Sequence, residues 1–249
     1  MCPVESEGCG NTSVHRLSPV DLPQEYEFLN QSCDPKEIER GTRDQADSQL
    51  WMKEKRNRLT ASNFGKVLQR KSTPNEKFLS KIFRPKSLEY GKRNEENAKA
   101  KYLKQHPSRH FHKCGLVINE KFTFLGARQD GKLCDDGVCG IVEIKCPFSA
   151  RNFTICQSLD AIQNFCLEKN NDGTIQLKRS HQYYVQIQGQ LMITGCEFCE
   201  FIVFTQKDLF VERILPDVTF MNAMLVKLAS FFKNHAKPLL DRNSSESMI

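Results

Sequence analysis

The chain has 249 residues, of which 39% are hydrophobic and 27% are charged, and its net charge at pH 7 is +6. These values are typical of a soluble globular protein with one sizeable core. No apolar run approaches the length of a membrane span, and residues 1–30 lack the basic start and apolar centre of a signal peptide. These features predict an intracellular protein, without distinguishing nucleus from cytoplasm.

The first segment, residues 1–44, is rich in Ser, Pro, Glu, Asn and Asp and has few spaced apolar residues. This composition predicts a flexible arm that packs little. We expect the globular domain to occupy residues 45–240 and to be followed by a tail at residues 241–249.

Helical periodicity marks the first part of this predicted domain. Four helices are expected, at residues 50–58, from Thr60 or Ser62 to Leu68, at residues 75–83 and at residues 88–104. The third helix would stop near Pro85 and the fourth before Pro107, because proline cannot continue a helix.

The same region is strongly basic. Residues 53–109 contain seventeen Lys and Arg against five Glu and no Asp, so their local charge is +12 and the rest of the chain carries −6. Solvated helix faces explain many such charges. A basic half beside an acidic, metal-binding half is nevertheless a suitable arrangement for holding a polyanion such as nucleic acid over a cation.

Strand patterns replace the helical ones after Cys114. A meander is expected from strands at residues 116–118 and 122–125, a short strand after Asp130, and a strand at residues 140–146. A helix at 157–167, a loop at 168–173, a helix at 181–193 ended by Gly195, strands at 200–204 and 209–215, and a helix at 218–235 follow. This order predicts a single α/β domain with a mixed central sheet flanked by helices.

Eleven cysteines are spread over a chain that is too large to need a disulfide scaffold, and we expect most of them to be reduced. Cys196 and Cys199 have the spacing of half a zinc knuckle. No second pair in the sequence has this spacing, so positions in the core or on strands are favoured, and whether the two bind a metal stays open.

The most informative motif is Glu143-Ile144-Lys145 on the strand at residues 140–146. Alternation along a strand places Glu143 and Lys145 on one face and Ile144 on the other, and Asp130 can meet them across a hairpin. Two carboxylates and the carbonyl of Ile144 are hard oxygen ligands, which suit Mg²⁺ or Mn²⁺ better than zinc. Lys145 beside a metal could orient the attacking water or balance charge on a phosphate.

A simpler interpretation exists for each part of this motif. Asp130-Gly131 is typical of a turn, and a Glu-x-Lys strand is usually a solvated face. Here, however, the strand is apolar and β-branched, as buried strands are, and Pro147 ends it just after the lysine. A charge pair at the end of a buried strand requires a functional reason.

A third acid comes from the helix at residues 88–104, which carries Glu95 and Glu96. Helical geometry turns these two side chains about a hundred degrees apart, so one of them could point at the metals while the other faces water. Two surface charges are the alternative for this helix taken alone.

Together these segments resemble the lambda-type exonuclease family, also called the YqaJ viral recombinase family, a branch of the restriction-endonuclease-like nucleases. The resemblance covers roughly residues 50–208. Its parts stand in the family's order: Trp51 with Lys55, Arg56 and Arg58 before Thr60-Ala61-Ser62; Gly91 with Glu95; Asp130-Gly131; Glu143-Ile144-Lys145-Cys146-Pro147-Phe148; and Tyr184-Val185-Gln186-Ile187-Gln188.

The resemblance implies a restriction-endonuclease-like domain in which Asp130, Glu143 and the carbonyl of Ile144 bind the catalytic metals. It also implies that Glu95 supports a second ion and that Lys145 is the catalytic lysine. The expected cofactor is therefore a pair of Mg²⁺ ions, with Mn²⁺ as a substitute. Hydrolysis would use one ion to activate water and the other to support the leaving oxygen.

Family members degrade double-stranded DNA from a 5′ end and hold the terminal phosphate in a pocket. The corresponding phosphate-binding residues in this chain would be Ser62, Lys55 or Arg56, Arg58, and Gln186 or Gln188. One departure stands before the first aspartate, where Arg128-Gln129 replaces a small residue and a proline. Arg128 could itself reach a phosphate or obstruct one, which affects end preference more than metal chemistry.

The sequence thus predicts a Mg²⁺-dependent deoxyribonuclease, acting as a 5′-to-3′ exonuclease on double-stranded DNA in recombination or repair. A structure-selective or nicking endonuclease with the same metal site is the nearest alternative. A catalytically inactive DNA-binding protein of the same fold is another, which the complete set of Asp130, Glu143 and Lys145 disfavours. Expected partners are double-stranded DNA and either further copies of the chain or a recombination protein, and no membrane.

Overall fold

The computed structural model describes residues 17–44, 49–83, 89–135 and 137–246. Its helices are η1 (Gln24–Leu29), α1 (Pro35–Gly41), α2 (Gln49–Arg56), α3 (Ala61–Leu68), α4 (Glu76–Phe83), α5 (Glu89–Gln105), η3 (Glu120–Phe122), η4 (Phe148–Ala150), α6 (Ile155–Ala161), α7 (Gln182–Thr194), α8 (Val218–Phe231), η5 (Phe232–Ala236) and α9 (Lys237–Glu246). Its strands are β1 (Leu59–Thr60), β2 (His110–His112), β3 (Leu125–Gly126), β4 (Gly131–Asp135), β5 (Val138–Lys145), β6 (Leu167–Lys169), β7 (Ile175–Leu177), β8 (Cys199–Phe204) and β9 (Leu209–Ile214).

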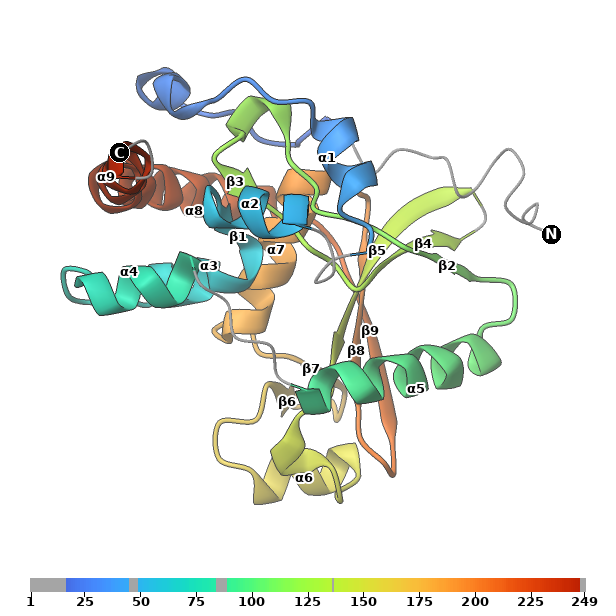
Figure 1. Cartoon of the computed structure of the whole chain (residues 1–249). Helices are drawn as coiled ribbons and strands as arrows, with labels where there is room; N and C mark the ends of the chain where they lie inside the picture. The colour runs from blue at the N-terminus through green and yellow to red at the C-terminus, as the bar shows by residue number, and fades with distance from the viewer. Residues whose placement is uncertain (1–16, 45–48, 84–88, 136, 247–249) are drawn as a thin grey trace.

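A five-stranded mixed sheet in the order β2-β4-β5-β8-β9 forms the centre of the fold (Figure 1). The β5–β8 pair is parallel, and the other neighbours are antiparallel. The central strand β5 is rich in Val and Ile, as expected of a strand covered on both faces. The predicted α/β domain with a mixed sheet flanked by helices is therefore confirmed.

Helices cover the two faces of this sheet unequally. On one face α5 packs, through Ala98 and Tyr102, against a small cluster that includes Val142, Ile144 and Ile202. The other face carries α7 and, behind it, α3 and α8, which together enclose the main core (Figure 1). Neighbouring residues of β5 consequently point into different layers: Val142 and Ile144 belong to the small cluster under α5, whereas Ile141 belongs to the main core and Glu143 faces α7.

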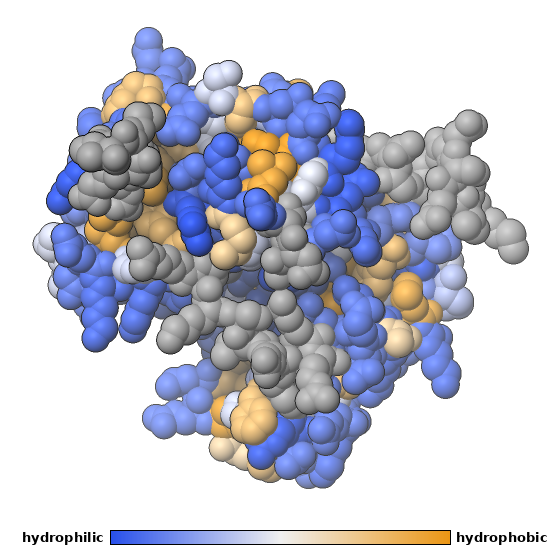
Figure 2. Space-filling view, viewed as in Figure 1, coloured by the Kyte–Doolittle hydropathy of each residue, from blue (hydrophilic) through white to orange (hydrophobic). Residues whose placement is uncertain are grey.

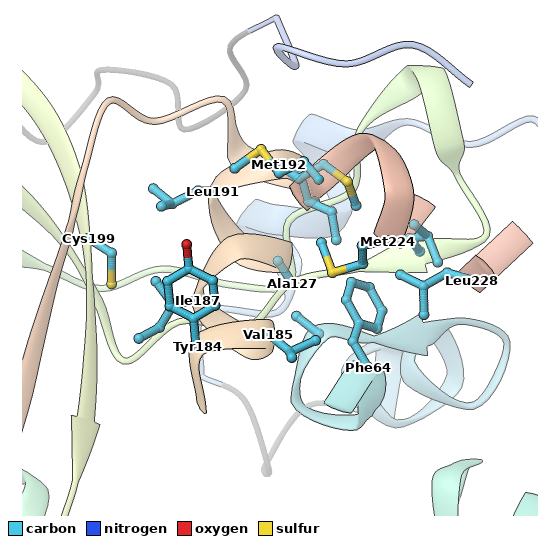
Figure 3. Close-up of a cluster of buried hydrophobic side chains, with 14 of the residues drawn as sticks. Phe64, Ala127, Tyr184, Val185, Ile187, Leu191, Met192, Cys199, Met224 and Leu228 are labelled. Atoms are coloured by element: carbon cyan, nitrogen blue, oxygen red, sulfur yellow. The ribbon is translucent and has the colours of Figure 1, made fainter. Parts of the chain in front are cut away.

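Helix α7 is buried along almost its whole length. Its side chains meet Phe64 of α3 and Met224 and Leu228 of α8 in one apolar cluster (Figure 3). Gly189 permits this packing, because a Cβ atom there would lie 2.5 Å from Cδ2 of Phe64. At its end, Gly195 adopts the left-handed conformation with φ of 66° and stops the helix, as the sequence predicts.

The N-terminal segment differs from the expectation of an arm that packs little. Within residues 17–43, Val20 and Leu29 are buried in the main core. Glu39 accepts a hydrogen bond from the backbone N–H of Gly115 at 2.9 Å. The prediction is therefore wrong for these residues, because a few well-spaced apolar side chains are enough to attach a polar segment to an existing core. Residues 1–16 lie outside the described part of the chain.

Several other boundaries also differ. The predicted strand at residues 116–118 is a single bridge between Val117 and Ala127, and residues 120–122 form a 3-10 turn. The helix expected to reach residue 167 ends at Ala161, and the hairpin of β6 and β7 follows it. The predicted tail begins as helix, since α9 continues to Glu246. Strand β2, at the edge of the sheet, was not predicted.

Hydrophilic residues cover most of the face seen in Figure 2, with apolar atoms in scattered places. None of the described helices is long and apolar enough to cross a membrane. Cys196 and Cys199 are buried free thiols. Burial raises the pKa of the Cys199 thiol far above its ordinary value, which disfavours the thiolate that zinc requires.

Candidate active site

The hairpin of β4 and β5 brings the first two acids together. Asp130 immediately precedes β4, and its backbone N–H donates to the carbonyl of Val142 at 2.9 Å. Its side chain turns toward the end of β5, where Oδ2 accepts the backbone N–H of Ile144 at 2.8 Å. The hairpin predicted from the sequence therefore fixes the Asp130 carboxylate beside Glu143-Ile144-Lys145.

Glu143 is only 2% exposed, and its carboxylate is surrounded by donors. Lys145 forms an ion pair with Oε1. From α7, Nε2 of Gln186 donates to Oε1 and Nε2 of Gln190 donates to Oε2, both at 2.6 Å. Charge-assisted bonds of this length are strong, so both carboxylate oxygens are held in fixed positions.

The electrostatics of this group reflect burial beside like charges. Burial raises the pKa of Glu143, and the neighbouring charge of Asp130 raises it further, while Lys145 opposes both. Burial alone would lower the pKa of Lys145, but Glu143 and Asp130 raise it above its ordinary value. Lys145 therefore stays protonated at neutral pH and is a permanent hydrogen-bond donor.

Glu95 approaches the same point from α5. It lines a pocket of about 150 Å³ together with Asp130, Glu143 and Lys145. Burial raises the pKa of Glu95, and the charge of Asp130 raises it further. Glu96 is 79% exposed and forms an ion pair with Lys99 at 3.0 Å. Of the two acids that the sequence left open, Glu95 is the one beside Asp130.

Residues from α2 and the start of α3 line the opposite side of this pocket. Lys55 and Ser62 are among them, and Arg128, from the segment before β4, and Gln186, from α7, also line the pocket. The ammonium of Lys55 lies 4.3 Å from the centre of the Trp51 ring. Burial, together with the charges of Arg128 and Lys66, lowers the pKa of Lys55 to about 8. This cation thus has little compensation from carboxylates and is suited to receive an anion.

Other predicted phosphate contacts lie elsewhere. Arg58 is 4% exposed, and its guanidinium is bonded to Glu54 and to the carbonyl of Thr123, so it ties α2 to the fold instead of facing a ligand. Gln188 is buried and bonds the backbone of the segment before α8. Each of these two side chains already uses its donors inside the protein, so neither lines the pocket in this structure. Arg56 is exposed, next to the Lys55 that enters the pocket.

Sequence reasoning missed Gln190. It stands one helical turn after Gln186, so the same face of α7 presents both amides to Glu143. Their spacing of four residues was a signal that could have found Gln190. The family pattern singles out Gln186 and Gln188, but helix residues that are two positions apart point in different directions.

The chemistry of these donors fits a hard divalent cation. Asp130, Glu143 and Glu95 supply carboxylate oxygens, and burial and then the charge of Asp130 raise the pKa of each of the two glutamates. A cation would relieve this repulsion. Among the described residues, no three His, Cys, Asp or Glu side chains already converge as a ligand set. In the structure, Glu143 is engaged with α7 and Lys145.

A mixed sheet between helices, with an acid before one strand and Glu-x-Lys on the next, defines the restriction-endonuclease-like fold. Within this class the chain belongs to the family of the YqaJ-like viral recombinase domain, which matches residues 50–197. The family expected from the sequence is confirmed. No curated protein matches the chain significantly.

Solved structures with this fold include exonucleases from a bacterium and from a virus. One is LHK-Exo, an alkaline exonuclease from Laribacter hongkongensis, whose structure in complex with dAMP is known. It is 20% identical to this chain with a TM-score of 0.59, and the match covers 80% of this chain and 99% of LHK-Exo. The Shutoff and Exonuclease Protein of Kaposi's sarcoma-associated herpesvirus is 16% identical with a TM-score of 0.55, covering 81% and 72%. A SOX–DNA complex is 14% identical with a TM-score of 0.51, covering 81% and 70%.

Proposed function

We propose that this chain is a Mg²⁺-dependent deoxyribonuclease that degrades double-stranded DNA from a 5′ end. The observation that carries the proposal is the meeting of Asp130, Glu143, Lys145 and Glu95 at one pocket in a YqaJ-like domain. A binding protein without turnover has no need of three buried or half-buried acids beside a buried lysine. Recombination or repair is the process that the family's description favours.

In this proposal Asp130, Glu143, Glu95 and the carbonyl of Ile144 hold two Mg²⁺ ions, or Mn²⁺ in their place. Such a pair supplies an activated water and stabilises charge on the attacking and leaving oxygens. Lys145 keeps its proton because of the carboxylates around it. Its part is therefore to donate a hydrogen bond to the scissile phosphate and to orient water, and it does not act as a general base.

The end of the DNA would lie on the side of the pocket formed by α2 and α3. Lys55 contributes a positive charge there, Ser62 a hydroxyl and Gln186 an amide. Arg128 stands between this group and Asp130, with Nη2 3.7 Å from Oδ1 of Asp130. These donors recognise phosphate oxygens without reading bases, so the proposed enzyme has no sequence preference at the end.

End-labelled linear and closed circular duplexes incubated with Mg²⁺, Ca²⁺ or a chelator test the proposal. We expect nucleotides to be released progressively from 5′-phosphorylated linear DNA with Mg²⁺ only, and circles to stay intact. Cutting of closed circles would replace the exonuclease by the structure-selective or nicking endonuclease. If no substrate is cut with Mg²⁺ while duplex binding is retained, the chain is a DNA-binding protein without catalytic activity.

A further inference from the structure

Gln190 makes two hydrogen bonds that join separate parts of the candidate site. Its Nε2 donates to Oε2 of Glu143 on β5 at 2.6 Å and to the carbonyl of Arg128 at 2.8 Å. Arg128 is two residues before Asp130, in the segment that leads into β4. One amide thus links the carboxylate of Glu143 to the backbone that carries Asp130.

The orientation of this amide is forced by its surroundings. Both neighbours of Nε2 are acceptors, so exchanging the amide oxygen and nitrogen would set an oxygen against each of them. In the observed orientation both N–H groups are used, and Oε1 is buried without a hydrogen-bond partner among the described residues. A buried carbonyl without a partner is unfavourable, and in native proteins it calls for an explanation.

Gln188 provides a contrast on the same helix. It is also buried, but both ends of its amide have partners: Nε2 donates to the carbonyl of Leu215 at 3.0 Å, and Oε1 accepts the N–H of Asp217 at 2.8 Å. Those bonds satisfy the backbone just before α8, whose N-terminus Asp217 caps. Gln188 therefore has an evident structural use, whereas Gln190 leaves one polar atom unsatisfied in order to hold Glu143.

We propose that Gln190 is a positioning residue that fixes Glu143 relative to Asp130 and so sets the affinity of the site for divalent cations. This inference rests on the proposed metal-dependent function and extends it to a residue that touches neither metal nor DNA. Removing a partner that orients a metal ligand lowers metal affinity by about 10–100-fold in other proteins. The same loss is expected here, because Glu143 would keep only the donors of Gln186 and Lys145.

The test compares Gln190→Met with Gln188→Met. Methionine nearly preserves side-chain volume and removes the amide. Replacing Gln190 removes the unsatisfied Oε1 but leaves the Arg128 carbonyl and Oε2 of Glu143 without their donor, so the midpoint of urea unfolding should fall. Replacing Gln188 leaves the Leu215 carbonyl and the Asp217 N–H without their partners, and the midpoint should fall as well, so Gln188→Met controls for a loss of stability alone.

Metal binding is measured directly, by titrating each purified variant with Mn²⁺ and following free Mn²⁺ by electron paramagnetic resonance. We expect Gln190→Met to raise the Kd for Mn²⁺ by about tenfold or more, and Gln188→Met to leave it near the wild-type value. In cleavage assays, excess Mg²⁺ should restore much of the Gln190→Met activity, as a defect in metal affinity requires.

An unchanged Kd for Mn²⁺ in Gln190→Met would overturn the inference, as would an equal increase in both methionine variants. Glu143→Gln separates this failure from failure of the proposed function. If Glu143→Gln abolishes Mn²⁺ binding while Gln190→Met does not alter it, only the positioning role is lost. If Glu143→Gln also binds Mn²⁺ normally, the metal site itself is assigned wrongly.

Discussion

Two groups of charged side chains lie at different places on the central sheet. On the α5 face, Asp135 and Glu200 meet Arg109 and Arg213 in an ion-pair network, with Arg213 2.6 Å from Glu200 and Arg109 3.3 Å from Asp135. At the end of β5, between α5 and α7, lies the candidate active site, where Asp130, Glu143 and Glu95 share a pocket with Lys145, Arg128 and Lys55. Each group contains a buried carboxylate, Glu200 in the first and Glu143 in the second, which needs partners.

The difference lies in how the surroundings shift the pKa values of the carboxylates. In the ion-pair network, two carboxylates face two guanidinium groups, and the bond from Arg213 lowers the pKa of Asp135. In the candidate site, three carboxylates share the pocket with Lys145, Arg128 and Lys55, yet burial together with Asp130 still raises the pKa values of Glu95 and Glu143. Cations that lower the pKa of their carboxylate partners stabilise a fold, whereas buried carboxylates whose pKa values stay raised form an arrangement that a ligand of opposite charge completes.

The largest expected effect follows from removing the central pair of the candidate site. Lys145→Ala and Glu143→Gln should each slow DNA cleavage by about a hundredfold or more, because each removes a group placed at the scissile phosphate or its metal. Duplex binding, measured by fluorescence anisotropy, should persist, since the basic surface is unchanged. Near-normal turnover in both variants would place the chemistry elsewhere.

Glu95 tests whether the group of carboxylates with raised pKa values extends to α5. Glu95→Gln should slow cleavage by about tenfold, because it removes one of three carboxylates around the pocket. Glu96→Gln is the matched control on the adjacent position, and its rate should stay within about twofold of wild type, as for other exposed groups. Equal small effects in the two variants would assign Glu95 to the solvated surface.

The ion-pair network around Arg213 should affect the stability of the fold and not the cleavage of DNA. Arg213→Ala should lower the free energy of unfolding by about 1–2 kcal/mol, a value reduced because Arg213 is partly exposed. Cleavage per folded molecule should remain close to wild type. Urea denaturation measures the first quantity, and Arg242→Ala, an exposed arginine on α9, is the control. A large loss of cleavage in stable Arg213→Ala would contradict the structural role of the network.

The smallest effect concerns Lys55, whose pKa of about 8 lies close to working pH. Below this pH the ammonium is charged and attracts a 5′ phosphate, and above it the charge is lost. The preference for 5′-phosphate over 5′-hydroxyl ends should therefore be several-fold near pH 7 and decline as pH rises through about 8.

Lys55→Arg sharpens this measurement, because a guanidinium stays charged throughout and should extend the preference to higher pH. Arg56→Ala, at the exposed neighbouring position, should leave the pH profile unchanged. If the preference for 5′-phosphate ends disappears in Arg56→Ala and persists in Lys55→Ala, the phosphate contact belongs to Arg56 instead of Lys55.

Patterns within single elements were predictable from the sequence, and contacts between elements were not. Alternation along β5 was enough to place Glu143 and Lys145 on one face, and the end of α7 at Gly195 followed from its glycine. Gln190 was missed because its role depends on which face of α7 meets β5. The packing of residues 17–43 was missed because a polar composition does not reveal where a few apolar side chains dock.

The close contact of Gly189 with Phe64 has a consequence for the product of the proposed reaction. Because it lets α7 lie directly on α3, Gln186 and Ser62 are carried by two helices packed in one core. The distance from the terminal phosphate to the cut bond is then a fixed length of DNA backbone. The enzyme would release fragments of constant size whatever the base sequence, and Gly189→Ala, which forces the two helices apart, would change that size or blur it.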